Sequence, residues 1–199
     1  MQLETPIGPL TVTATKKAVT AIRFGTQVPE GSARCTAAEA TPLLRKAAEE
    51  IGEYFAGSRR KFTLPLAPEG SPFQQKVWEA LRNIPYGETR TYKQIAIQIG
   101  HNQSFRAVGM ANNRNPIVIV VPCHRVIGAD GSLTGYAGGI DKKVKLLELE
   151  HADMRGFFVP KKGTARAGET VVRRLPERPR PSVPPPRHPY SGRRSASSR

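Results

Sequence analysis

The sequence predicts an α+β (or α/β) fold. A small N-terminal β-sheet-plus-helix domain precedes a mostly helical C-terminal domain with a helix-turn-helix and a strand leading into a candidate active site. Two alternating, β-branched segments come first, several capped segments with helical apolar spacing follow, and one short apolar run lies between the later helices. With 199 residues, 38% of them hydrophobic, the chain is long enough for one or two small cores.

The N-terminal domain is predicted to span residues 1–66. Residues 10–15 alternate in hydrophobicity and are rich in β-branched side chains, and residues 18–24 are predicted to form the return strand. Thr41 followed by Pro42 is typical of a helix start, because the threonine hydroxyl accepts a free backbone N–H and proline fits the first turn. Residues 67–72, which contain two prolines and a glycine, are interpreted as a linker.

The C-terminal domain is predicted to span residues 73–158. Ser71, Thr91 and Ser104 each precede a segment with helical spacing of apolar residues. The last two of these helices are separated by a break that begins at Gly100, which is the layout of a helix-turn-helix. Helical hairpins that merely pack have the same layout, so the pattern leaves DNA binding and simple packing open.

The rest of the chain contains a candidate strand, a final helix and a tail. Residues 117–121 form a continuous apolar run, as a fully buried strand does. A last helix is predicted from Asp141 onward. Residues 159–199 are rich in proline, arginine and serine and have little apolar content, so we predict a basic, Pro/Arg-rich disordered tail. Such a tail either adds non-specific DNA affinity or is dispensable.

The charge of the chain is unevenly spread. The formal net charge is +15, and residues 160–199 hold 11 Lys or Arg against 2 Glu, which leaves +6 for residues 1–159. A basic surface suits a polyanion such as nucleic acid. An ordinary soluble surface explains the charge equally well.

The number of cysteines and the N-terminal sequence indicate in which compartment the protein is expected. Cys35 and Cys123 are too few for a disulfide framework and favour free thiols. The N-terminus lacks the pattern of a signal peptide, and no apolar run reaches membrane-spanning length. We therefore expect a cytoplasmic protein with no membrane partner. Residues 1–66 offer one cysteine and no histidine, so we expect no metal there.

A candidate nucleophile follows the predicted buried strand in the segment Pro122–Arg125. A free thiol has a pKa near ~8.5, so a nucleophilic cysteine needs a base or a positive charge beside it. His124 is adjacent to Cys123, but neighbours on a strand point to opposite faces, so contact requires a turn or a bridging water. Buried cysteine is also common as inert packing.

Glu150 is a candidate partner for the histidine. It follows Leu146 by four residues and Leu147 by three, which puts it beside the apolar stripe of the final helix. An inward carboxylate needs a partner, and a histidine is a suitable one. From spacing alone, a solvated glutamate is the simpler interpretation.

The segment Pro122–Val126 resembles the active-site signature of the O6-alkylguanine-DNA alkyltransferases, also called methylated-DNA–protein-cysteine methyltransferases. The resemblance covers about residues 71–151, and residues 1–66 fit the family's less distinctive N-terminal domain. It rests on further motifs in matching order: Tyr86-Gly87-Glu88, Thr91-Tyr92, Arg106-Ala107-Val108-Gly109, Asn115-Pro116 and Gly135-Tyr136.

The resemblance implies a single-use DNA-repair enzyme without a cofactor. Such a protein flips O6-alkylguanine out of double-stranded DNA and transfers the alkyl group irreversibly to Cys123. It implies that His124 acts through a water molecule as the base and that Glu150 holds and polarises His124. Tyr92 is then the hydrogen-bond donor to the purine ring as guanine leaves.

The resemblance also assigns the DNA contacts. Arg106 is expected to enter the base stack, and Asn115 to brace the turn after the second helix of the helix-turn-helix. Tyr136 is expected to form one wall of the pocket. Independently of the resemblance, the basic side chains of Lys93, Arg106 and Arg114 are candidates for phosphate contacts. The helix-turn-helix is expected to lie in the minor groove, and the protein to act as a monomer.

Two other functions remain open from the sequence. The chain could be a helix-turn-helix binding module with a structural cysteine, although lesion-sensing relatives replace the acceptor cysteine and this chain keeps it. It could also be a Cys-His-Glu hydrolase that turns over an acyl substrate repeatedly. Val118 and Ala137 stand where some members of the family have Pro and Ser, which leaves the range of alkyl groups open.

Overall fold

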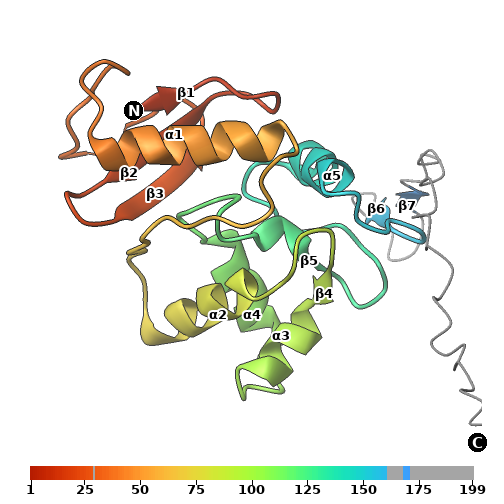
Figure 1. Ribbon diagram of the computed structural model, residues 1–199. Coiled ribbons are helices and arrows are strands. Elements are labelled where there is room, and N and C mark those ends of the chain that lie inside the picture. Colours follow the sequence, from red (N-terminus) through yellow and green to blue (C-terminus); the bar gives the residue numbers. More distant parts are fainter. Residues whose placement is uncertain (29, 161–167, 171–199) are drawn as a thin grey trace, which may run out of the picture.

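The structure is a computed structural model that describes residues 1–28, 30–160 and 168–170. A small sheet with one helix lies beside a cluster of helices, and the final helix lies close to both (Figure 1). This arrangement confirms the predicted fold class, with its N-terminal sheet and helical C-terminal part.

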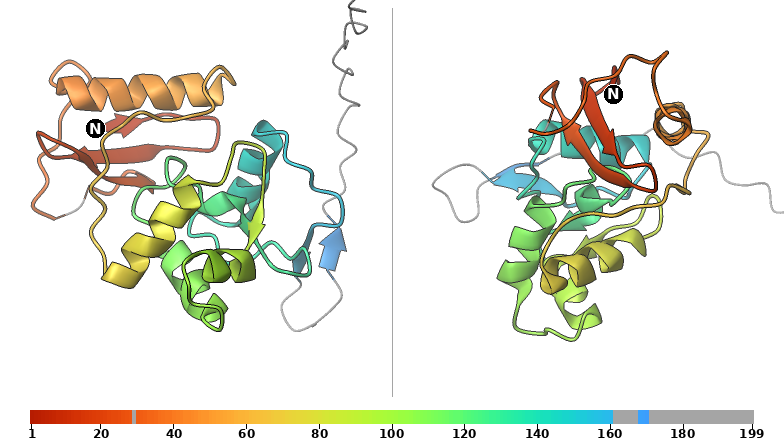
Figure 2. Two further views of the ribbon diagram at one scale, coloured as in Figure 1. Left: turned by 60° about the horizontal axis from the view of Figure 1, so that its bottom comes forward. Right: turned by 90° about the vertical axis from the view of Figure 1, so that its left-hand side faces the viewer.

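The N-terminal sheet has three antiparallel strands in the order β1 (Gln2–Leu3), β2 (Leu10–Ala14) and β3 (Val19–Phe24). Helix α1 (Pro42–Phe55) packs along one face of this sheet (Figure 2). Its start is as predicted, because the Thr41 side chain accepts a hydrogen bond from the Leu44 amide. Thr41 thus satisfies one of the free N–H groups of the first turn.

Three helices form the body of the C-terminal part: α2 (Pro72–Arg82), α3 (Tyr92–Gln98) and α4 (Phe105–Asn113). Ser71 and Thr91 each form a complete capping box with a glutamine three residues later. The Ser104 side chain makes no capping hydrogen bond. Helices α3 and α4 pack on each other and on α2, which gives the predicted helix-turn-helix.

The C-terminal part is completed by short strands and one more helix. β4 (Arg90–Thr91) pairs in parallel with β5 (Val126–Ile127), and α5 (Ile140–Leu149) packs against the segment that precedes β5. A single-turn 3-10 helix, Cys123–Arg125, lies directly before β5. Among the described residues, no helix is long and apolar enough to cross a membrane.

The predicted strand at residues 117–121 is wrong in conformation, although the run is buried as expected. Only Ile117 forms a strand-like bridge, to Ile22, and the following residues turn. Ile119 has φ of 73°, in the left-handed region that a β-branched residue rarely adopts. The turn closes through a hydrogen bond from the Val121 amide to the Ile117 carbonyl, so no active-site strand forms.

The two parts of the chain share one hydrophobic core. The Ile22 amide donates to the Pro116 carbonyl, and the Val118 amide donates to the Ile22 carbonyl, so β3 is tied directly to the buried turn. Buried side chains of β2, β3 and α1 continue into those of α2, α3 and α4 in a single cluster. The N-terminal sheet therefore supports the turn that leads to Cys123.

The predicted tail falls largely outside the described residues. Within it, β7 (Gly168–Thr170) pairs antiparallel with β6 (Phe158–Pro160), which differs from the disorder expected from residue 159. Phe157 and Val159 pack on a small apolar cluster with Leu133 and Met154, and this packing anchors β6. The predicted boundary after residue 158 divides this short apolar segment, so Val159 was assigned to the tail.

Candidate active site

Cys123 begins the 3-10 helix and is buried. Asn115 Nδ2 lies 3.0 Å from Cys123 Sγ and 2.8 Å from the Val121 carbonyl oxygen. The side-chain amide of Asn112 donates to the Cys123 carbonyl. Burial raises the pKa of the Cys123 thiol, whereas the Asn115 amide and the Lys143 charge oppose that rise. Asn115 thus holds the sulfur in place, and Asn115 and Lys143 limit the rise in its pKa.

His124 follows Cys123 within the 3-10 turn, so the two residues do not alternate across a strand. His124 is fully buried, and its Nε2 lies 2.8 Å from Glu150 Oε1. A carboxylate can only accept, so Nε2 carries the proton and Nδ1 presents a lone pair. Nδ1 is buried without a hydrogen-bond partner among the residues described, and burial lowers the pKa of His124, so the ring is a neutral base at pH 7.

Glu150 ends α5 as its C-cap residue and is buried in a cage of donors. Besides His124, its oxygens accept hydrogen bonds from Arg125 Nε and Nη2, each at 2.8 Å, from the Tyr54 hydroxyl at 2.7 Å and from the Gly87 amide at 3.2 Å. Burial would raise the pKa of Glu150, but the hydrogen bonds from His124 and Arg125, together with the charge of Arg125, hold it well below its usual range. The carboxylate is therefore ionised.

Two members of this cage were missed in the sequence. Arg125 follows His124 directly, and a buried carboxylate that faces a histidine also needs a permanent charge, which was a usable signal. Tyr54 comes from α1, 96 residues before Glu150. No local pattern marks it, because it has the helical spacing of an ordinary core residue.

Asn115 and Tyr136 were expected among the DNA contacts, but both are buried. The Asn115 side-chain oxygen accepts the Ile117 amide and its nitrogen donates to Val121, so it spans the buried turn. Tyr136 packs edge-on against Phe24 from the sheet, and its hydroxyl has no partner among the described residues. Neither side chain reaches the surface, so each can meet only a nucleotide that enters the protein.

The side chains of Tyr92 and Lys143 meet at one backbone carbonyl group. The Tyr92 hydroxyl donates to the Thr134 carbonyl at 3.1 Å, and Lys143 Nζ donates to that carbonyl at 3.0 Å and to the Val126 carbonyl. Burial lowers the pKa of Lys143 to about 8, while the neighbouring Cys123 opposes this shift. Lys143, which the sequence did not single out, thus ties the segment around Thr134 to the strand that follows Cys123.

Arg106 and Arg114 lie apart from this buried cluster, on exposed positions of α4 and its C-cap. Neither forms an ion pair within the described part of the chain. Their charges are available to a partner at the surface of the helix-turn-helix.

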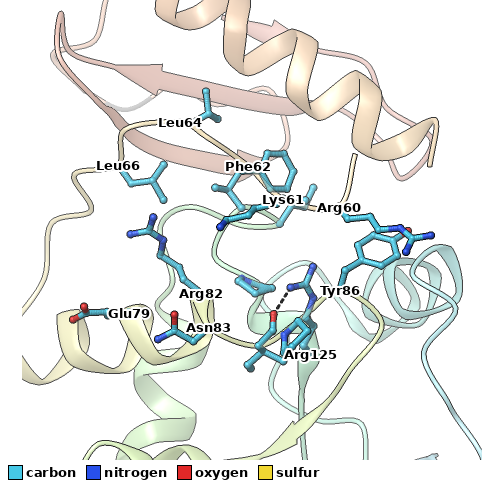
Figure 3. A pocket seen from close by; sticks show the side chains of 15 residues that line it. Arg60, Lys61, Phe62, Leu64, Leu66, Glu79, Arg82, Asn83, Tyr86 and Arg125 are labelled. Carbon is cyan, nitrogen blue, oxygen red and sulfur yellow. Dashed lines mark hydrogen bonds between the residues drawn. The ribbon is translucent and has the colours of Figure 1, made fainter. Parts of the chain in front are cut away.

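A groove of about 540 Å³ lies behind the turn that leads to Cys123, between the end of α2 and residues 60–66 (Figure 3). Lys61 and Arg82 extend into it from opposite sides, and Arg125 forms part of its floor with a hydrogen bond to the Ile84 carbonyl. Neither Cys123 nor His124 lines this groove. It is therefore separate from the nucleophile.

The fold and the site together define a helix-turn-helix protein with a buried cysteine beside a histidine–glutamate pair. Family models match both parts of the chain. Residues 72–152 match the 6-O-methylguanine DNA methyltransferase, DNA binding domain, and residues 2–68 match the ribonuclease-like domain of the same enzyme. This chain belongs to the 6-O-methylguanine DNA methyltransferase family.

Individual relatives agree with the family models. The methylated-DNA–protein-cysteine methyltransferase of Methanosarcina barkeri is 49% identical over 77% of this chain and 97% of its own length. The protein of that name from Mycolicibacterium paratuberculosis is 51% identical over 74% of this chain and 89% of its own. A solved structure of Mycobacterium tuberculosis OGT in complex with DNA has a TM-score of 0.70 at 44% identity, over 78% of this chain and 96% of its own.

Proposed function

We propose that this protein repairs DNA by direct reversal, removing the alkyl group from O6-alkylguanine in duplex DNA and keeping it on Cys123. The observation that carries the proposal is the position of the thiol. Cys123 Sγ is held by Asn115 at 3.0 Å, next in sequence to a histidine fixed on a buried carboxylate, and it lies behind a helix-turn-helix. Membership of the family agrees with this chemistry.

The buried position of the sulfur requires the base to leave the duplex. A reactive carbon inside a stacked helix cannot reach a fully enclosed thiol, so the nucleotide rotates out into the protein. Arg106, exposed on α4, enters the stack and fills the gap. Arg114 contacts a phosphate, which makes binding dependent on salt. We place the helix-turn-helix in the minor groove and take one monomer as the acting unit.

Transfer is a displacement at the saturated alkyl carbon. His124 Nδ1 accepts the Cys123 proton through a water molecule, and the Glu150 carboxylate stabilises the imidazolium that results. The thiolate then forms a new S–C bond while the C–O6 bond breaks, and its electron pair goes to the guanine. The purine takes up a proton and ends as ordinary guanine.

Two tyrosines lie where the departing base must be held. Tyr92 exchanges its bond to the Thr134 carbonyl for one to the purine and stabilises the charge that develops there. The buried Tyr136 ring forms a wall of the pocket. The product is a thioether, whose C–S bond at an unactivated alkyl carbon is not hydrolysed by water, so each molecule reacts once. A reducing compartment such as the cytoplasm keeps the thiol free beforehand.

Stoichiometry tests the proposal. A duplex with one O6-methylguanine is incubated with increasing amounts of protein, and the remaining lesion is measured by chromatography of the digested DNA. We expect one guanine restored per protein molecule, with a plateau that more time does not change. Repeated turnover would contradict the single-use mechanism and favour a hydrolase, while binding without any loss of lesion would favour a sensing module.

A further inference from the structure

The helix-turn-helix carries the exposed large apolar side chains of the described part of the chain. Ile97 on α3 is 52% exposed, and Phe105 and Met110 on α4 are 46% and 60% exposed. A phenylalanine beside the exposed Arg106 is unusual in a surface meant only for phosphate contacts. An aromatic ring at such a position suits a base or a sugar, which offers apolar surface.

Phe105 has a defined place on α4. Residues four and seven positions apart share one face of a helix, so Phe105 lies on the same face as Gly109 and Asn112. Asn112 donates to the Cys123 carbonyl, and Gly109 faces Tyr92, whose ring would lie 3.8 Å from a β-carbon placed there. This face therefore runs from the nucleophile, past Tyr92, to Phe105 at the exposed end of the helix.

Gly109, in the middle of this face, lets the Tyr92 ring lie close to α4, because a β-carbon there would be only 3.8 Å from the ring. Phe105 stands one helical turn beyond Gly109, at the surface, and Arg106 is rotated by about 100° from it around the helix axis. The two neighbours therefore point to different places. Under the proposed function Arg106 fills the gap in the base stack, while Phe105 lies at the exposed end of the face that carries Gly109 and Asn112.

We infer that Phe105 is the aromatic rim of the path by which the flipped guanine nucleotide reaches Cys123. This inference rests on the proposed function. The ring packs against the extrahelical nucleotide and holds it out of the stack, while Arg106 fills the gap that it leaves. Phe105 is thus a positioning residue for the nucleotide and makes no contact with the reacting atoms.

Two readouts test this role in Phe105→Ala. The first is the fluorescence of a duplex with 2-aminopurine, which rises when that base leaves the stack, measured at saturating protein. The second is the single-turnover rate of transfer from an O6-methylguanine duplex, compared with the rate for the free base O6-benzylguanine. We expect a loss of roughly tenfold in the duplex rate, the size of one lost base–aromatic contact, and a smaller fluorescence rise. The free-base rate should not change.

Ile97→Ala is the matched control, because it removes a similarly exposed apolar side chain from α3. It should leave both rates and the fluorescence unchanged, and Phe105→Tyr should restore most of the duplex rate. If Phe105→Ala matches the wild-type protein in fluorescence and in both transfer rates, while the wild-type protein transfers the alkyl group, the inference is wrong and the proposed function stands. An equal loss with duplex and free base would also overturn it, because it would indicate a deformed pocket. A wild-type protein that flips 2-aminopurine but transfers nothing would overturn the proposed function instead.

Discussion

The hydroxyl of Tyr54 donates a 2.7 Å hydrogen bond to Oε1 of Glu150, the same oxygen that accepts from His124. Burial and the adjacent carboxylate raise the pKa of Tyr54, so the hydroxyl stays protonated and remains a donor. The N-terminal part of the chain therefore contacts the site through a side chain as well as through the packing of its sheet. Its helix α1 helps to determine the charge and position of the carboxylate behind the histidine.

Tyr54→Phe tests this link. The change removes one donor from a buried carboxylate and leaves the ring in place, so we expect a loss of about 1.5–3 kcal/mol in the free energy of unfolding. Because Oε1 then interacts more strongly with His124, the pKa of His124 should rise. Urea unfolding measures the first effect and NMR titration of the imidazole the second. Unchanged values for both would mean that the bond is not formed in solution.

The lowered pKa of Lys143 predicts that the stability of the protein depends on pH. Its pKa is about 8 in the folded protein, against 10.5 as the ordinary value, so between these pH values the unfolded chain binds more protons. The free energy of unfolding should therefore rise with pH in this window, by about 3 kcal/mol in total. Lys143→Met, measured by urea unfolding across the same range, should lack this rise. If the free energy of unfolding rises equally with pH in the wild-type protein and in Lys143→Met, the low pKa of Lys143 is contradicted.

Asn115→Ala should shift the pH profile of transfer. The Asn115 amide favours the thiolate form of Cys123, so its loss raises the pKa of the thiol and moves the half-maximal rate to higher pH. The rate with O6-benzylguanine as the free base measures this without involving DNA binding. Asn113→Ala, at the exposed last position of α4 and two residues before Asn115, is the control and should keep the original profile. A lower rate with an unshifted profile would show that Asn115 only supports the fold.

Arg106→Ala should separate base flipping from chemistry. Without a side chain to fill the gap in the stack, repair of a duplex should fall by at least tenfold, about 1.4 kcal/mol, while the rate with O6-benzylguanine stays the same. Arg114→Ala should instead weaken DNA binding and lower its salt dependence. If Arg106→Ala slows both substrates equally, Arg106 does not occupy the stack.

The helices could be predicted because their starts are encoded locally. Thr41, Ser71 and Thr91 cap their helices as expected. Ser104 makes no capping hydrogen bond, so the second helix of the helix-turn-helix could be predicted only from its apolar spacing. The buried turn at residues 117–121 could not, because a continuous apolar run has the same appearance in a strand and in an enclosed turn. The left-handed conformation of Ile119 depends on tertiary contacts and leaves no trace in neighbouring residues.

The site also contains residues that the sequence could indicate and residues that only the fold brings together. Cys123 and His124 are adjacent in the sequence. The approach of Glu150 to His124 was implied by the resemblance, because the apolar spacing of the final helix alone favoured a solvated glutamate. The contact of Tyr54 and the position of Lys143 depend on how distant segments pack. Resemblance to a family implied which residues react, but only the fold shows that one carboxylate accepts hydrogen bonds from His124, Arg125 and Tyr54 together.

Intact-protein mass spectrometry tests the central claim most directly. The protein is incubated with a duplex that contains one O6-methylguanine, and its mass and peptide map are then measured, with Cys123→Ala as the control. We predict that a methyl group replaces one proton on Cys123, that the gain stops at one per molecule, and that Cys123→Ala binds the DNA without gaining mass. A methyl group on another residue, such as Cys35, or loss of the lesion with no change in protein mass, would contradict the account.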